Sequence, residues 1–217
     1  MISIPVRIYV LCKAKWIKSK KPTNIGKRLN DYRKSINTNE NLIVFSFFQS
    51  PLSFDLNASS IIPKVITVSP EWAATLILSN DDATKNAFQI TIGHELAHKD
   101  GDFAVLFWER KRKRYIHKED RKFVNWVTEV HHDFAAAEKM VESSKKKLIE
   151  SIEYKIAMKP NNMDSTSHPS WKQRKSYAEI GAFNRQLIDT IAFNTDCTNI
   201  TLIEEVSCFY KDIILMD

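Results

Sequence analysis

Cysteine is scarce in this sequence. The 217 residues include three, Cys12, Cys197 and Cys208. They are odd in number, widely spaced and never in a CxxC pair, so we expect neither a disulfide framework nor a cysteine-ligated zinc ion. The three cysteines are predicted to be reduced thiols.

Long apolar runs are missing as well. The runs at 41–48 and 212–216 are far shorter than the roughly 20 residues that cross a bilayer, so no membrane span is expected. The first residues, MISIPVRIYVLC, lack a charged region followed by a long apolar stretch, and do not resemble a signal peptide. These absences together favour a cytoplasmic protein.

Internal repeats and long low-complexity linkers are also absent. With 43% hydrophobic residues, the chain is long enough for one substantial core, whereas two domains would each be small. We therefore predict a single domain over 1–217. The net charge of +6 is a modest excess and identifies no partner.

The motifs that matter lie on two of the helices predicted after a short strand. Residues 65–68, VITV, form a β-branched run that is typical of a strand. Asp81 and its neighbours supply cap chemistry for a helix at about 83–100, which Gly101 can end. A longer helical pattern extends from Phe123 towards Ala157, with apolar residues at three- and four-residue steps.

The motif HExxH, formed by His94, Glu95 and His98, lies inside the first of these helices. Residues four apart share one helix face, so both imidazoles can bind one zinc ion while Glu95 lies beside it. A catalytic zinc usually keeps three protein ligands and one position for water. Glu95 would take a proton from that water as it attacks a carbonyl and pass it to the leaving amine. The alternative interpretation is a chance match on a helix without metal.

A third ligand has to come from elsewhere in the chain. The pattern HExxHxxGxxH would supply it from the same stretch, but Ala104 occupies the position of its last histidine. The later helix offers Glu129 and Asp133, four apart on one face, followed by small residues at 135–137. Small side chains let two helices approach closely enough to share a metal.

HExxH followed on a second helix by ExxxD and small residues resembles the gluzincin zinc metallopeptidases, and among them the M48-like peptidases. The resemblance implies that Glu129 is the third zinc ligand and that Asp133 is an acceptor that orients His94 and fixes its tautomer. It also implies one Zn²⁺ per chain and a polypeptide substrate whose peptide bonds are hydrolysed. His131 and His132 are local competitors: His132 can approach the metal if the helix rotates, whereas His131 is expected on the surface or in packing.

A second resemblance lies downstream, where residues 168–174 match the HPxxxxR element found near the end of M48-like catalytic domains. It implies that His168 enters the cleft and either assists the transition state or caps the zinc in a resting form. Arg174 would brace the site through a carboxylate. The other interpretation of His168 is a histidine in a solvated loop.

The resemblance also implies a fold. It covers about 61–192, which would be the catalytic core, and leaves 1–50 as an N-terminal extension of unassigned role. The expected class is α+β, a mainly helical zincin-like domain with a small β-sheet. The strand 65–68 resembles the edge strand along which gluzincins bind an extended substrate by strand addition, although an interior strand would have the same pattern.

A basic segment, residues 108–122, suggests a different class of function. Its lysines and arginines, with Trp108 and Tyr115 among them, could bind nucleic acid in a salt-dependent way, with a structural metal or none. Such a segment is more often a solvated connection. A third possibility is a regulatory peptidase that cleaves a repressor or partner, gated by His168 or by a flexible loop at 158–170.

Overall fold

The computed structural model describes part of the chain in detail: residues 43–46, 58–62, 65–68, 75, 79, 81–98, 117–138 and 145–210. Most of the predicted N-terminal extension, 1–50, and most of the basic segment, 108–122, lie outside the described residues. Among the helices that are described, none combines the length and the apolar character that a membrane crossing requires.

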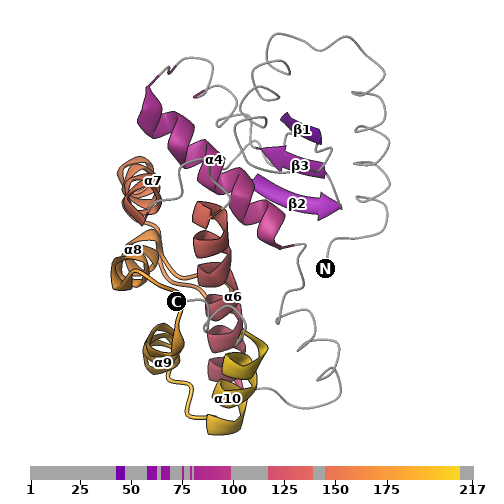
Figure 1. Ribbon diagram of the computed structural model, residues 1–217, viewed down its shortest axis with the longest axis vertical. Helices are drawn as coiled ribbons and strands as arrows, with labels where there is room; N and C mark the ends of the chain where they lie inside the picture. Colours follow the sequence, from indigo (N-terminus) through magenta and orange to yellow (C-terminus); the bar gives the residue numbers. More distant parts are fainter. Residues whose placement is uncertain are drawn as a thin grey trace.

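Six helices make up most of the described chain (Figure 1). They are α4 (Asp82–Ala97), α6 (Lys118–Glu138), α7 (Lys145–Met158), α8 (Trp171–Ile180), α9 (Arg185–Asn194) and α10 (Ile200–Phe209). The helical pattern predicted from Phe123 towards Ala157 is thus two helices, α6 and α7, rather than one. Val127 of α6 packs with α9 and α10, whereas Leu148 of α7 packs with α4, α8 and the C-terminal end of α6.

Three short strands pair beside α4: β1 (Ile43–Ser46), β2 (Ala58–Ile62) and β3 (Val65–Val68). Their order is β1-β3-β2, with β1 parallel and β2 antiparallel to β3. The expectation of an edge strand at 65–68 is therefore wrong, because β3 is paired on both sides. Its β-branched run predicts a strand but carries no information about how many neighbours the strand has.

The expectation of an α+β fold is also wrong, because helices, which make up most of the described chain as expected, supply nearly all of its described core. Among the described residues, two of the three apolar cores contain helical and loop residues alone; one is formed by α6, α8, α9 and α10 and the other by α4, α6, α7 and α8. The strands place two fully buried side chains, Ile66 and Val68, in the third core, against Phe88 and Ile92 of α4. Helices thus bury one another, and the strands cover one flank of α4.

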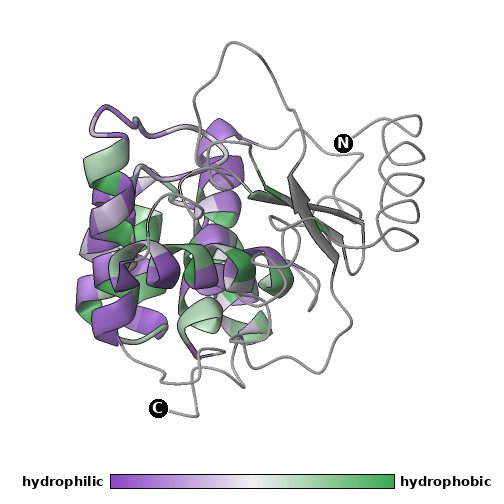
Figure 2. Ribbon diagram, turned by 90° about the horizontal axis from the view of Figure 1, so that it is seen from above, coloured by the Kyte–Doolittle hydropathy of each residue, from purple (hydrophilic) through white to green (hydrophobic). Residues whose placement is uncertain are grey.

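Local sequence explains where several helices begin and end. The Asp81 side chain accepts a hydrogen bond from the Thr84 amide at 2.7 Å, which caps α4. Ser170 caps α8 by accepting from the Gln173 amide, and Gly181 ends that helix at a φ of 102°, where glycine carries no steric penalty. In Figure 2, hydrophobic residues (green) lie where the helices face one another and hydrophilic ones (purple) lie on the outer turns.

Candidate metal centre

The two histidines of the HExxH motif lie on the side of α4 that faces α6. Phe88 and Ile92, on the other side of α4, pack against β3, so His94 and His98 are turned towards α6. The centroids of these two imidazole rings are 5.2 Å apart. Glu95 lies between the two histidines along the helix and is half-buried.

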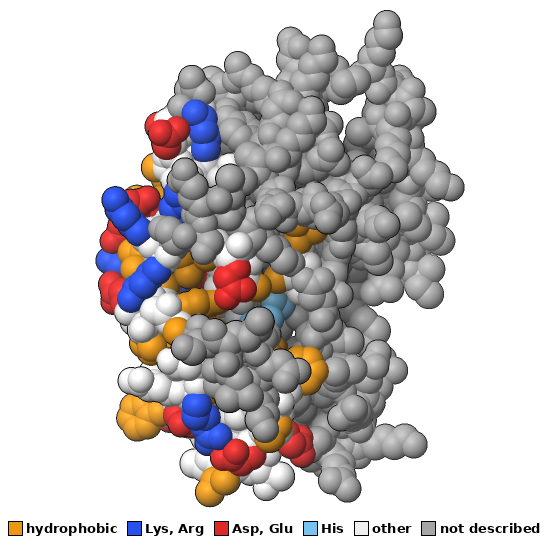
Figure 3. Space-filling view, in the orientation of Figure 1, with side chains coloured by type: hydrophobic (Ala, Val, Ile, Leu, Met, Phe, Trp, Pro, Cys, Tyr) orange, Lys and Arg blue, Asp and Glu red, His pale blue; other side chains and the backbone are white. Residues whose placement is uncertain are grey.

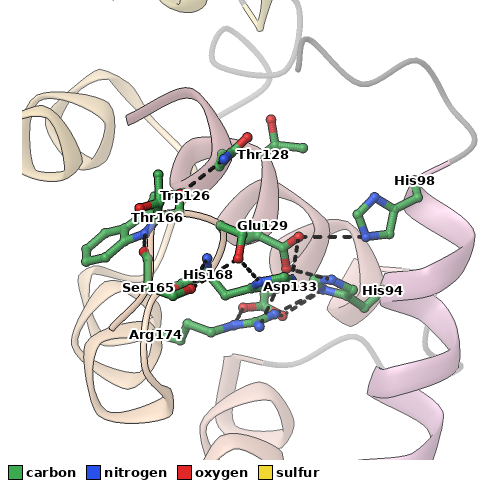
Figure 4. Close-up of polar contacts among 12 residues, drawn as sticks. His94, His98, Trp126, Thr128, Glu129, Asp133, Ser165, Thr166, His168 and Arg174 are labelled. Atoms are coloured by element: carbon green, nitrogen blue, oxygen red, sulfur yellow. Dashed lines mark hydrogen bonds and ion pairs between the residues drawn. The ribbon is translucent and has the colours of Figure 1, made fainter. Parts of the chain in front are cut away.

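The Glu129 carboxylate, on α6, faces both imidazoles (Figure 4). Its Oε2 atom is 3.2 Å from His94 Nε2, and its Oε1 atom is 3.9 Å from His98 Nε2. Two imidazoles and one carboxylate that converge in this way are the donor set of a three-ligand zinc site. The structure thus brings together the three residues that the sequence suggested as ligands.

A very close approach of α4 and α6 makes this convergence possible. A Cβ atom added to Gly93 would lie 3.0 Å from the Cβ and 3.1 Å from the Cα of Ala136. Contacts of that length are rarely tolerated, so any larger residue at 93 would push the helices apart. The small residues predicted on the second helix include Ala136, and its partner is the glycine that immediately precedes the HExxH motif.

Asp133 lies behind His94, on the side away from Glu129. Its Oδ1 atom is 3.0 Å from His94 Nδ1, and Arg174 donates from Nε to Oδ2 at 2.6 Å and from Nη2 to Oδ1. Arg174 Nη2 is also 3.1 Å from His94 Nδ1, but both nitrogens carry protons and both donate to the same carboxylate. Asp133 and Arg174 therefore form a buried ion pair that fixes the orientation of the His94 ring.

The charges around His94 alter its protonation. Burial disfavours the imidazolium, but the hydrogen bonds to Asp133 and Glu129 outweigh burial and raise the pKa of His94 to about 9. Burial likewise opposes ionisation of the two carboxylates, yet the neighbouring cations hold the pKa of Glu129 and of Asp133 well below the ordinary range. A metal ion that binds His94 Nε2 must therefore displace a proton.

A third imidazole, that of His132, completes a cluster that can hold a metal ion. One potential ligand atom from each of His94, His98 and His132 lies within 4.8 Å of the others. The ring of His132 is 4.0 Å from that of His98 and 5.3 Å from that of His94, centroid to centroid. The sequence pointed to His132 only as a competitor of Glu129, through its spacing of three residues on the same helix.

His168 approaches Glu129 from the loop that precedes α8. Its Nε2 atom is 3.4 Å from Glu129 Oε1, and its side chain is 59% exposed. On the face shown in Figure 3, histidine atoms (pale blue) reach the surface near hydrophobic side chains (orange). His131, in contrast, packs its ring against Phe183 and Tyr210, at centroid distances of 5.0 and 4.6 Å.

The loop that carries His168 is fastened to α6. The Trp126 indole donates to the Ser165 carbonyl at 2.8 Å, and the Asn125 amide donates to the Thr166 carbonyl at 3.0 Å. The Ser165 hydroxyl accepts from the His168 amide at 2.9 Å. These hydrogen bonds hold residues 165–168 against α6, and the flexible loop suggested for 158–170 stays a prediction.

Sequence reasoning overlooked Lys155, which is buried on α7 at 6% exposure. Its Nζ atom lies 4.4 Å from the centroid of the Trp171 ring, and the Arg174 guanidinium lies equally far from the same ring. Burial, followed by the charge of Arg174, lowers the pKa of Lys155 to about 8. Its spacing from Leu148 and Ile152, four and then three residues, placed it on the apolar face of the helix and could have revealed it.

Comparisons with known proteins add no relative. No protein-family model matches the chain, and no curated protein or solved structure is significantly similar to it. Function must therefore be argued from the geometry of the site.

Proposed function

We propose that this protein is a zinc-dependent metallopeptidase of the gluzincin type, with His94, His98 and Glu129 as zinc ligands. The observation that carries the proposal is the Glu129 carboxylate opposite both HExxH imidazoles, at 3.2 and 3.9 Å. Imidazole and carboxylate donors suit zinc well. A zinc ion held in this way lowers the pKa of a water molecule and polarises a substrate carbonyl.

The role proposed for Glu95 follows from the HExxH motif, and those of the other residues follow from their positions. Glu95 accepts the proton of the attacking water and delivers it to the leaving amine, which is the role of a general base that then acts as an acid. Asp133 accepts from His94 Nδ1, which leaves Nε2 for the metal, and Arg174 holds Asp133 in place. His168, beside Glu129 and partly exposed, is positioned to contact a substrate carbonyl.

The substrate class is polypeptide, and this rests on the HExxH chemistry. Strand addition along β3 no longer supports it, because β3 has a neighbour on each side. The sparse cysteines favour a reducing compartment, so the proposed location is the cytoplasm.

A structural metal is the second candidate, favoured by the His132 imidazole beside the other two. In that case the protein would be a regulatory or nucleic-acid-binding protein rather than an enzyme. A structural zinc site has four protein ligands and leaves no position for water. Glu95 would then have no chemical role.

Metal analysis and a protease assay on matched variants separate these candidates. We expect one zinc per purified chain and hydrolysis of unfolded casein by the parent. Glu95→Gln should keep the zinc and lose hydrolysis, whereas Glu129→Ala should bind zinc more weakly. Glu150→Gln, a change of the same kind on the surface of α7, should match the parent. A parent without stoichiometric metal would overturn the proposal. If the parent and Glu95→Gln both bind zinc and hydrolyse casein equally fast, Glu95 is not the general base.

A further inference from the structure

His132 lies at the candidate metal centre in addition to the three proposed ligands. It is 1% exposed, and it lies three residues after Glu129 and one before Asp133, so all three side chains leave the same face of α6. That face is turned towards the HExxH residues of α4. The site thus contains four groups of metal-ligating chemistry, His94, His98, Glu129 and His132.

The ring positions are compatible with three imidazoles around one ion. The His94 ring is 5.2 Å from the His98 ring and 5.3 Å from the His132 ring, centroid to centroid, with interplanar angles of 78° and 89°. Potential ligand atoms of all three histidines lie within 4.8 Å of one another. Zinc–imidazole bonds are about 2.0–2.1 Å long, so the three side chains would have to turn towards the ion on binding.

We propose that His132 is the fourth protein ligand, so that the resting metal centre is closed by His94, His98, Glu129 and His132. This inference rests on the metal site of the proposed function, and it adds a way in which the peptidase activity is regulated. A catalytic zinc needs a position for water, and four protein side chains fill a tetrahedral site. The loaded enzyme is therefore largely latent: it hydrolyses substrate only while one ligand is displaced, so the parent is slow and not inactive.

The experiment uses zinc-loaded and cobalt-substituted full-length protein, and compares the parent with His132→Ala and His131→Ala. His131 is the matched control, because it is the adjacent histidine and packs against Phe183 and Tyr210 instead. In the parent we expect X-ray absorption at the zinc edge to count three imidazoles, and the visible spectrum of cobalt to be that of four-coordinate metal.

In His132→Ala we expect the imidazole count to fall to two and the cobalt spectrum to weaken as solvent raises the coordination number. Zinc affinity, measured against a chromogenic chelator, should fall by about 100-fold, since even the loss of an outer partner of a ligand costs about 10–100-fold. Casein hydrolysis at saturating zinc should be faster than in the parent. His131→Ala should keep the parent spectrum, affinity and rate.

Each result is decisive. Two imidazoles in the parent, with an unchanged cobalt spectrum in His132→Ala, would overturn the closed site and leave the proposed peptidase standing. A spectral change without faster hydrolysis would overturn latency. The absence of metal from the parent would overturn both proposals. If His132→Ala fails to fold, the imidazole count in the parent decides by itself.

Discussion

Two faces of α6 are buried against different kinds of side chain, one apolar and the other charged or polar. One face carries Phe123, Val127 and Val130, at steps of four and three residues, and packs with the apolar side chains of α9 and α10. The other carries Glu129, His132 and Asp133 and meets histidines and an arginine. Apolar burial depends on volume, whereas burial of charge depends on each partner being present. The two faces should therefore respond differently to the same kind of substitution.

The largest effect is expected on the polar face. Arg174→Met removes the guanidinium from the Asp133 carboxylate, which is 3% exposed, and leaves His94 as its remaining charged neighbour. The free energy of unfolding should fall by about 3–5 kcal/mol, measured by urea denaturation at pH 7. Arg185→Met is the control, because Arg185 pairs with Glu204 on the surface, and its loss should cost about 1 kcal/mol or less. Similar losses in both variants would contradict the contrast between buried and exposed pairs.

The apolar face should be sensitive to volume alone. Leu187, fully buried on α9, packs with this face of α6. Leu187→Ala should lower the free energy of unfolding by about 3 kcal/mol through the cavity it leaves, and Leu187→Met should lower it by less than about 1.5 kcal/mol. Denaturant titration gives both values, and the metal content of both variants should equal that of the parent. Altered metal content would show that the two faces are coupled.

Burial of Lys155 should make the free energy of unfolding depend on pH. Its pKa is lowered from 10.5 to about 8 in the folded protein, so between these values the unfolded chain binds more protons. Stability should then rise with pH in this window, by up to about 1.4 kcal/mol per pH unit. Denaturation of the parent and Lys155→Met at pH 7, 8 and 9 isolates this slope from other groups, such as Cys197, whose pKa burial raises to about 11. If the free energy of unfolding changes equally with pH in the parent and in Lys155→Met, Lys155 is not the cause of the slope.

The smallest effect is expected where α4 and α6 touch. Gly93→Ala places a Cβ atom 3.0 Å from that of Ala136, which should cost about 1–3 kcal/mol, partly offset by about 1 kcal/mol of helix propensity. A net loss of about 1 kcal/mol and weaker zinc binding are expected, by denaturation and chelator competition. The double variant Gly93→Ala/Ala136→Gly removes the contact between the two Cβ atoms but keeps the 3.1 Å contact with the Cα atom of residue 136, so it should recover only part of both. If neither the free energy of unfolding nor the zinc affinity recovers at all in the double variant, the spacing of the two helices does not determine how the site binds zinc.

Periodicity in the sequence accounts for much of this molecule. The helix of the HExxH motif and the apolar steps on α6 could be predicted, because both depend on residues close in the chain. The interior position of β3 could not, because strand pairing depends on segments distant in sequence. The fold class was wrong for a related reason: motifs resembling a family do not determine how much of the core its strands supply.

The candidate site divides in a similar way. His94, Glu129 and Asp133 could be suggested from spacing and from a resemblance, and the structure brings them together. The sequence could not show whether His132 and Lys155 belong to the site. A polar side chain on a helix meets a partner, an apolar core or solvent according to how that helix is oriented against its neighbours. Such orientations result from packing that a single sequence does not specify residue by residue.

The hydrogen bonds from Asn125 and Trp126 to the loop at 165–166 have a mechanical consequence for the site. They join the loop that carries His168 to the same helix that carries Glu129, so these two side chains belong to one hydrogen-bonded unit. His94 and His98 belong to another, the helix α4. The separation of the two units is set where Gly93 meets Ala136, so a displacement of one helix would change the distances from Glu129 to the two histidines while leaving its distance to His168 unchanged.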